Sequence, residues 1–409
     1  MKKVIVGINP CNEGCTGRIN SQILEMAEKS GFDVYLGIGP YGHEKSKCIK
    51  QISIGNKITT KVNNFIDKYA GGQKYIALIS TKLFIRKLKK INPVLIQLHV
   101  LEANYINFEI LLKYAQKNGI RVVWTLHDAW AMTGRCAYFE LNGCDKWKNG
   151  CGQCQFPRQY PAAGKKDYSR TNYAYKNRVL DTISDMTIVT PSKWLANIAK
   201  ESPLLKKFPV VIIPNGIDLQ VFRPVDATEL RKKLELQNKK VVLGVANGWE
   251  KRKGLKYMKY LSKHLPEEYQ VVIVGLDREE TDFGSNCTII KRTTNIEEMV
   301  AFYSMACVFA NPTLEDNFPT TNLEALACGT PVITFKTGGS PDAIDESCGL
   351  VVEKNSEALL AGVLNLSKRG ITVDVCRKQA MQFDKNARFM DYVKLYERIL
   401  ENESFNKLC

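Results

Sequence analysis

The chain has no long hydrophobic run and contains few histidines. No stretch of its 409 residues approaches the roughly 20 consecutive apolar residues that a membrane-spanning helix needs. The apolar run at 4–8 is too short for a signal peptide and meets a polar residue at Asn9. We therefore expect a first β-strand there, in a cytoplasmic protein. Only four histidines can supply an imidazole, and His99 and His127 both follow apolar runs that predict strands.

Acidic residues are scarce in the first half of the chain. Residues 1–218 contain 32 Lys and Arg against 16 Asp and Glu, whereas 219–409 contain 26 of each, so the first half carries the whole net charge of +16. Residues 51–100 are the extreme, with nine basic residues and one acid, Asp67. A one-sided basic surface attracts nucleic acid, anionic lipid or a phosphorylated substrate. An ordinary solvated basic face would have the same composition.

Continuous apolar runs bounded by turn residues predict parallel strands that are covered on both faces. Such runs alternate with helical patterns, which indicates two doubly wound α/β domains. The predicted strands lie at 4–8, 34–38, 94–98, 122–126, 187–190 and 210–213, and at 241–246, 271–275, 288–290, 307–310 and 332–335. We expect a first domain at 1–213, a linker at 214–224, a second domain at 225–386 and a closing helical segment at 387–409. Two prolines bracket an Asn-Gly turn in the linker, which stiffens both of its ends.

The segment 311–340 carries the densest chemistry in the chain. It contains two acids, a short helix and two glycine turns: Glu315, Asp316, a helix opened by Thr320 or Thr321 that carries Glu324, Gly329, and Gly338-Gly339. Glycine turns beside a helix N-terminus present backbone N–H groups to an anion. A carboxylate one or two turns into that helix suits the hydroxyls of a sugar or ribose. The pattern therefore predicts a site for a nucleotide-sugar diphosphate, whereas Glu315 by itself is expected to be a solvated acid.

This segment resembles the donor-binding signature of retaining glycosyltransferases of family 4, which have the GT-B fold. In that family two acids stand eight positions apart, followed by Ala, Gly-x-Pro-Val and Gly-Gly; Asp316 and Glu324 keep this spacing. The first acid is usually Glu, so Asp316 is a departure. The linker also resembles that of the family. The resemblance implies two Rossmann-like domains that face a central cleft, with a C-terminal helix that crosses back to the first domain.

The resemblance also implies roles for individual residues. Lys253-Gly254 matches the family's diphosphate-binding turn, but the usual Arg, five residues before the Lys, would fall on Gly248 and is missing, so Arg252 is a candidate substitute. The implied catalytic residues are His127, Asp316 and Lys253. The implied acceptor-binding residues are His99, His127 and Asp128. The implied donor-binding residues are Gly14, Gly17, Arg252, Lys253, Asp316, Phe318, Thr320, Thr321, Glu324, Gly338 and Gly339.

By this resemblance the chain is expected to be a retaining hexosyltransferase that needs no metal or other cofactor for catalysis. It would move a sugar from a UDP- or GDP-sugar to a saccharide or lipid-diphosphate-saccharide acceptor in bacterial surface-polysaccharide synthesis. Two alternatives stay open: a GT-B sugar-nucleotide epimerase, and a nucleic-acid-binding protein. The second alternative lacks interleaved basic and aromatic residues, so no nucleic-acid partner is expected.

Two further features concern the first half of the chain. Cys136, Cys144, Cys151 and Cys154, spaced C-x7-C-x6-C-x2-C, fit a tetrahedral structural zinc, although four unligated thiols have the same spacing. The region around them is similar to a subset of family 4 enzymes of bacterial surface-polysaccharide synthesis. The basic helix at 81–90 either packs on the sheet or lies on an anionic membrane. We expect peripheral contact with the inner face of the cell membrane.

Overall fold

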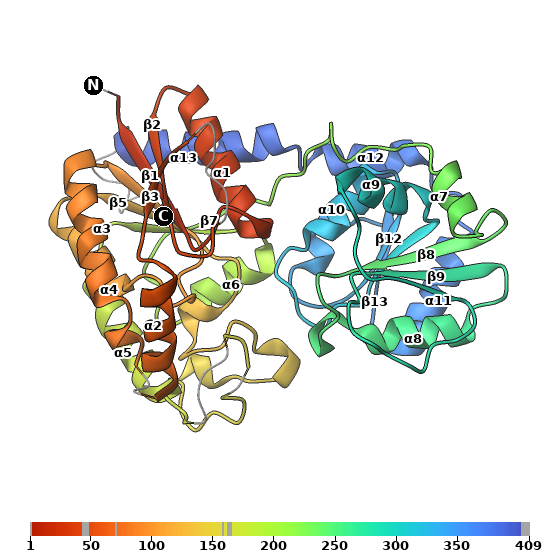
Figure 1. The fold of residues 1–409 in the computed structure, drawn as a ribbon, viewed down its shortest axis with the longest axis horizontal. Helices are drawn as coiled ribbons and strands as arrows, with labels where there is room; N and C mark the ends of the chain where they lie inside the picture. Colours follow the sequence, from red (N-terminus) through yellow and green to blue (C-terminus); the bar gives the residue numbers. More distant parts are fainter. Residues whose placement is uncertain (1, 43–48, 70–71, 158, 162–165, 402–409) are drawn as a thin grey trace. The chain divides into compact units, whose positions relative to one another are not determined.

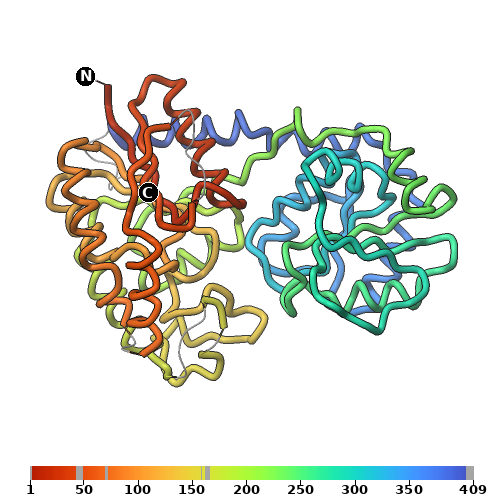
Figure 2. Tube along the Cα trace, in the orientation of Figure 1, coloured from red at the N-terminus to blue at the C-terminus, as the bar shows by residue number. Residues whose placement is uncertain are grey.

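The computed structural model describes residues 2–42, 49–69, 72–157, 159–161 and 166–401 (Figures 1 and 2). The chain divides into two compact units. The first comprises Met1–Pro214 together with Asn386–Cys409, and the second comprises Asn215–Lys385. Within the described ranges, no helix combines the length and the apolar character needed to cross a membrane.

The first unit is built on a seven-stranded parallel sheet with the strand order β3-β2-β1-β4-β5-β6-β7. Its strands are β1 (Val4–Asn9), β2 (Asp33–Ile38), β3 (Lys50–Ser53), β4 (Leu95–Leu98), β5 (Arg121–Thr125), β6 (Met186–Thr190) and β7 (Val210–Ile212). Its helices are α1 (Gly14–Lys29), α2 (Lys57–Tyr69), α3 (Leu78–Ile91), α4 (Phe108–Lys117), α5 (Ser169–Asp181), α6 (Lys193–Glu201) and α13 (Lys385–Glu401).

Alternating side chains of each strand enter two apolar cores, one on each face of this sheet, as the two-residue period of a strand requires. On β1, Ile5 packs into the core that contains α1 and α13, whereas Val6 packs into the core that contains α3 and α4. Helix α13 contributes Phe389, Tyr392, Val393, Leu395, Tyr396 and Ile399 to its core. The predicted return of the C-terminal helix to the first domain is thus confirmed.

The second unit is built on a six-stranded parallel sheet with the strand order β10-β9-β8-β11-β12-β13. Its strands are β8 (Lys240–Val245), β9 (Tyr269–Val274), β10 (Cys287–Ile290), β11 (Val308–Asn311), β12 (Val332–Phe335) and β13 (Gly349–Val352). Its helices are α7 (Thr228–Lys233), α8 (Leu255–His264), α9 (Ile296–Met305), α10 (Thr320–Ala327), α11 (Ser356–Leu366) and α12 (Val373–Met381).

The sequence missed two strands, β3 and β13, and both lie at the edge of their sheet. An edge strand is covered less completely than a central one, and both strands carry exposed or half-buried positions. The sequence of β3, Lys-Gln-Ile-Ser, lacks the continuous apolar run by which the other strands were predicted, whereas that of β13, Gly-Leu-Val-Val, has such a run and was overlooked.

Candidate active site

The loop between β11 and α10 is fixed by two glycine turns that press against its backbone. Gly254 and Gly338 both have positive φ angles, 77° and 53°. A Cβ atom on Gly254 would lie 2.0 Å from the Pro312 carbonyl O, and one on Gly338 would lie 2.0 Å from the Asp316 carbonyl O. The Gly339 N–H also donates to the Asp316 carbonyl O at 3.0 Å. Only glycine allows this close approach, so both turns pack directly against the backbone of the loop and hold it in place.

Asp316 forms an ion pair with the basic turn that precedes α8. Its Oδ2 lies 2.6 Å from Lys253 Nζ and 3.5 Å from Arg252 Nη1. Burial alone would raise the pKa of the Asp316 carboxyl, but the charges of Lys253 and Arg252 outweigh that effect and lower it. The side chains of Lys253 and Asp316 remain 25% and 17% exposed, so the pair can still reach a ligand. The structure thus joins three of the residues that the resemblance singled out.

Glu315 differs from the prediction that it would be a solvated acid: it is fully buried. Its carbonyl O accepts hydrogen bonds from Arg252 Nη1 at 2.8 Å and from Thr313 Oγ1 at 3.2 Å. These bonds hold the loop against the domain and exclude water from the Glu315 side chain.

The helix α10 begins at Thr320, as the sequence predicted, and carries Glu324 just over one turn later. The Tyr303 hydroxyl, on α9, donates a hydrogen bond of 2.7 Å to Glu324 Oε2. Tyr303 itself is fully buried, and its bond fixes the direction in which the carboxylate points. Sequence reasoning missed Tyr303, because no motif marks that helix. The Phe318 ring packs in the core, 5.7 Å from the ring of Phe383, so it supports the loop from inside.

In the first unit, two neighbouring parallel strands bring His99 and His127 together. His99 directly follows β4, His127 follows β5 by two residues, and β4 pairs with β5. His99 Nδ1 lies 2.8 Å from His127 Nε2, and the two rings are stacked. Burial lowers the pKa of His127 to about 4, and burial together with His127 lowers the pKa of His99. Both imidazoles are therefore neutral near pH 7.

A small cavity of about 10 Å³ lies beside this histidine pair. Its lining includes all three predicted acceptor-binding residues together with residues that the prediction did not name: His99, Glu102, Trp124, His127, Asp128 and Trp130. Glu102 is the residue of chemical interest that the sequence missed. Burial first, and then the neighbouring Asp128, raise its pKa well above the ordinary range. Asp128 Oδ1 accepts a hydrogen bond of 2.8 Å from the backbone N–H of Trp130.

The remaining predicted donor-binding glycines, Gly14 and Gly17, belong to the first turn of α1. Gly14 has a φ of 68°, and a Cβ on Gly17 would lie 2.6 Å from the backbone of Asn12. Both positions thus require glycine for the turn itself. Their predicted contact with the donor remains a prediction.

The four cysteines predicted to bind zinc line one cavity of about 170 Å³. The Gly134 N–H donates to Cys151 Sγ at 3.1 Å, the kind of contact that supports a thiolate. Within the described residues, however, no group of three or more His, Cys, Asp or Glu side chains is arranged to hold a metal ion. Four cysteine thiols are ligands that suit zinc, but in this structure they are not arranged around a common metal position. The zinc site therefore stays a prediction.

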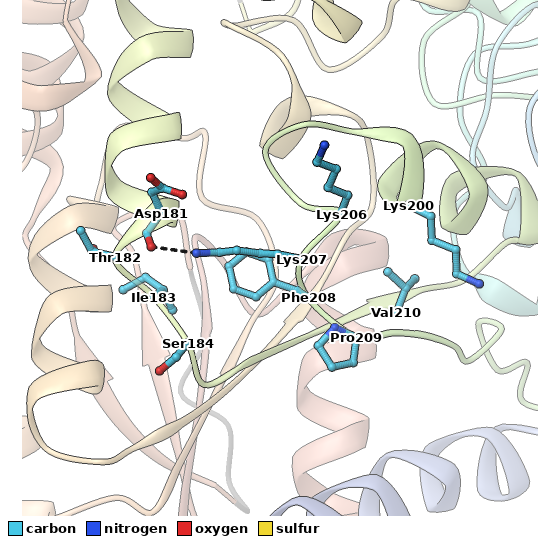
Figure 3. Close-up of a pocket in the computed structure, with 10 residues that line it drawn as sticks. All are labelled: Asp181, Thr182, Ile183, Ser184, Lys200, Lys206, Lys207, Phe208, Pro209 and Val210. Carbon is cyan, nitrogen blue, oxygen red and sulfur yellow. Dashed lines mark hydrogen bonds between the residues drawn. The ribbon is translucent and has the colours of Figure 1, made fainter. Parts of the chain in front are cut away.

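A much larger cavity, about 710 Å³, lies elsewhere in the first unit (Figure 3). It is formed by the segments that lead into β6 and β7, including Ser184 and Pro209, and so lies at the amino ends of these strands. The Lys207 Nζ donates to the Asp181 carbonyl O at 2.8 Å, whereas the Lys200 and Lys206 ammonium groups point in different directions. Ligand sites of doubly wound folds lie at the carboxyl ends of strands. We therefore take the loops described above, each within its own unit, as the candidate sites in preference to this cavity.

Comparison with known proteins agrees with this arrangement. Solved structures with the same two-unit fold include a sucrose-phosphate synthase of Thermosynechococcus elongatus, with a TM-score of 0.72, 17% identity and coverage of 98% of this chain and 100% of that one. The structure of HepE of Anabaena in complex with UDP and glucose has a TM-score of 0.63 and 14% identity, covering 97% and 100%. The fold is therefore GT-B.

The sequence comparisons add the family of the second unit. Residues 226–389 match the family model described as glycosyl transferases group 1. The colanic acid biosynthesis glycosyl transferase WcaC of Escherichia coli is 26% identical over 75% of this chain and 77% of its own length. Several other curated relatives match over only about half of their length. The chain is thus a GT-B protein whose second unit is a group 1 glycosyltransferase domain.

Proposed function

We propose that the chain is a retaining glycosyltransferase that moves a sugar from a nucleotide-diphosphate sugar, with UDP or GDP, to a lipid-linked or growing saccharide. Bacterial surface-polysaccharide synthesis is the pathway class, by analogy with the WcaC relative. The observation that carries the proposal is the Asp316–Lys253 pair held against the glycine turns, inside the region matched by the group 1 family model.

The donor contacts follow from the charges on this loop. Lys253 and Arg252 would meet the diphosphate, and the backbone N–H groups near Thr320 and Thr321, at the start of α10, would add to them. Glu324, oriented by Tyr303, would accept hydrogen bonds from ribose hydroxyls. Because negative charge develops on the leaving phosphate, stabilisation of that charge is the main catalytic contribution.

The transferred sugar would be positioned by Asp316 and His127. Lys253 already bonds one oxygen of Asp316, which leaves the carboxylate ionised and able to accept from a sugar hydroxyl. In a same-face mechanism the leaving phosphate takes the proton of the acceptor hydroxyl, so no side chain acts as a nucleophile and no metal is needed. We therefore assign positioning and charge stabilisation to these residues.

A thermal-shift screen tests the donor site. The full chain is heated with UDP, GDP, ADP, CMP or dTDP, and with NAD and a short DNA duplex as controls. A ligand that binds only the folded protein raises the unfolding midpoint. We expect one nucleoside diphosphate to raise it and to name the base. A response to NAD or DNA alone would contradict the proposal. An epimerase would convert the nucleotide sugar without an acceptor, so an acceptor-free assay separates that alternative.

We further propose that the first unit contacts an anionic membrane through α2. In this helix the buried face is polar and the exposed face is apolar. Its buried side chains are polar: Thr60, Asn63 and Asp67. Asp67 forms a buried ion pair with Arg135 at 2.7 Å, and Asn63 bonds the Asn104 carbonyl O and the Ala77 N–H.

The outer face of α2 is apolar. It is formed by four residues at helical spacing that are 73%, 53%, 64% and 57% exposed: Ile58, Val62, Phe65 and Tyr69. Ile79, in the first turn of α3, is 74% exposed as well. The single acid of residues 51–100, Asp67, is paired with Arg135 inside, whereas the lysines of α2 are exposed: Lys57, Lys61 and Lys68. Apolar side chains ringed by positive charge suit an anionic lipid surface.

Vesicle flotation tests this surface. We expect the full chain to float with phosphatidylcholine vesicles that contain phosphatidylglycerol and not with phosphatidylcholine alone, since each near-surface Lys or Arg contributes about 1 kcal/mol. The double variant Ile58→Ser, Phe65→Ser should lose this binding. Met381→Ser is the matched control, because Met381 is 55% exposed on α12 of the other unit. Equal flotation of the double variant, or binding to DNA instead of vesicles, would contradict the proposal.

For the cysteine-rich segment we propose a structural zinc, on the strength of its donor set. Metal analysis of the full chain should find one zinc per chain, and Cys144→Ser should abolish it. Because zinc binding contributes to folding free energy, a chelator should lower the unfolding midpoint. A metal-free wild-type chain with an unchanged midpoint would rule the zinc out.

A further inference from the structure

A buried polar chain connects the C-terminal helix α13 to His127. The Tyr396 hydroxyl donates a hydrogen bond of 2.9 Å to Gln97 Oε1. Gln97 lies on β4, and both side chains are fully buried. Gln97 in turn lies next to His99, whose Nδ1 meets His127 Nε2 at 2.8 Å. Residues nearly 300 positions apart thus form one continuous path of hydrogen bonds within the first unit.

Two contacts set which way the Gln97 amide faces. The Leu98 carbonyl O can only accept, so the amide atom 3.4 Å from it is the NH₂ nitrogen. Oε1 then faces the other side, where it accepts from the Tyr396 hydroxyl. Nε2 also donates to Thr125 Oγ1 at 2.8 Å. Its second hydrogen is directed at the Leu98 carbonyl O and at His99 Nε2, each 3.4 Å away. An amide nitrogen donates and does not accept, so His99 Nε2 can only be the acceptor in this contact.

This direction determines the proton positions of both histidines. A neutral imidazole carries one proton, so His99 must hold its proton on Nδ1. That Nδ1–H then donates to His127 Nε2. His127 accepts at Nε2 and, being neutral, carries its own proton on Nδ1. The depressed pKa values of both rings agree with two neutral histidines.

We propose that Tyr396, Gln97 and His99 are positioning residues that hold His127 in the Nδ1–H tautomer. His127 would then meet a sugar hydroxyl as a hydrogen-bond donor and would not act there as a general base. The contact with the sugar rests on the proposed function, whereas the tautomer does not. The inference also gives α13 a role beyond packing, because the Tyr396 hydroxyl on that helix bonds Gln97 Oε1 and helps to hold the amide in this direction.

The tautomer can be measured without any substrate. The full chain is labelled with ¹⁵N-histidine, and long-range ¹H–¹⁵N correlation spectra report which ring nitrogen bears the proton. Only four histidines contribute, and His99→Gln and His127→Gln assign the two that matter. We expect protonated Nδ1 and bare Nε2 for both residues. A protonated Nε2 on His127, or rapid averaging between the tautomers, would overturn the proposal.

Two variants test the direction of this hydrogen-bond chain. One should reverse the direction, and the other should make it variable. In Gln97→Glu an ionised carboxylate accepts from both Tyr396 and His99, so both histidines should switch to the Nε2–H tautomer. In Tyr396→Phe the amide loses its fixed direction, and the His127 signal should show both tautomers. If Gln97→Glu fails to fold, the wild-type and Tyr396→Phe spectra still decide the question.

Kinetics separate positioning from simple packing. Tyr396→Phe should lower kcat by about tenfold, the size of one neutral hydrogen bond, with the KM for the donor changed less than twofold. Tyr392→Phe is the comparison: Tyr392 lies one turn earlier on α13 and bonds Thr125 at 3.2 Å, so it touches Gln97 only through Thr125 and its loss should lower kcat less. Equal losses in both variants would indicate packing and contradict the proposal. An Nδ1–H tautomer in a chain without any transferase activity would support the positioning chain and refute the proposed function.

Discussion

The loop around Asp316 in the second unit and the histidine pair of the first unit use polar side chains in opposite ways. Around Asp316 the groups are ionised, paired within 2.6 and 3.5 Å and still partly exposed. Around His127 the groups are neutral and connected by directional hydrogen bonds that run into the core. A charged cluster attracts a phosphate from a distance, because charge interactions fall off slowly. A chain of hydrogen bonds between neutral groups instead determines which ring nitrogen carries the proton, and it attracts a charged ligand only weakly.

The largest expected effect tests the charged cluster. Lys253→Ala removes the cation that lies against Asp316 and would neutralise the diphosphate. Loss of one such group at a developing charge costs about 10²–10³-fold in kcat, and steady-state kinetics with the donor found in the thermal-shift screen would measure it. Lys251→Ala is the matched control, since Lys251 is exposed on the same turn. A loss below tenfold in Lys253→Ala, or equal losses in both variants, would mean that fixed charge does not dominate at this loop.

The next effect tests the neutrality of the histidine pair through stability. In the unfolded chain His127 has its ordinary pKa of about 6.5, and in the folded chain its pKa is about 4. Between these values the unfolded state binds more protons, so the free energy of unfolding should fall as the pH falls from about 6.5 to about 4. The limiting slope is roughly 1.4 kcal/mol per pH unit, an upper bound of about 3 kcal/mol in total.

Urea unfolding at several pH values would measure this slope. His127→Gln should reduce the slope without abolishing it, because glutamine does not titrate but His99, whose pKa is also lowered, still does. His264→Gln is a control in the other unit, where the imidazole is exposed and bonds the Tyr260 carbonyl O. An unchanged slope in His127→Gln would show that the pair is not held neutral by the fold.

The same contrast explains what the sequence could predict. The segment 311–340 is contiguous, so its spacing pointed to Asp316, Glu324 and the Gly338-Gly339 turn, whereas Lys253-Gly254 was singled out by the resemblance. Tyr303 and Glu102 reach their partners only through the packing of other elements, and no local pattern marks them. Helix α2 shows the limit most clearly. Its apolar spacing is visible in the sequence, but a core-facing stripe has the same spacing, and only the buried bonds of Asn63 and Asp67 show which face points outward.

The smallest expected effect separates the contribution of the Glu324 charge from the contribution of its orientation by Tyr303. Glu324→Ala should weaken binding of the nucleoside diphosphate by about 1.5–3 kcal/mol, the range for a hydrogen bond to a charged group. Tyr303→Phe keeps the carboxylate and removes only the 2.7 Å bond that orients it. It should therefore weaken binding by less, about tenfold or below, as measured by calorimetric titration. If Tyr303→Phe costs as much as Glu324→Ala, direction matters at the donor site as much as at the histidine pair. The two regions would then differ in charge alone.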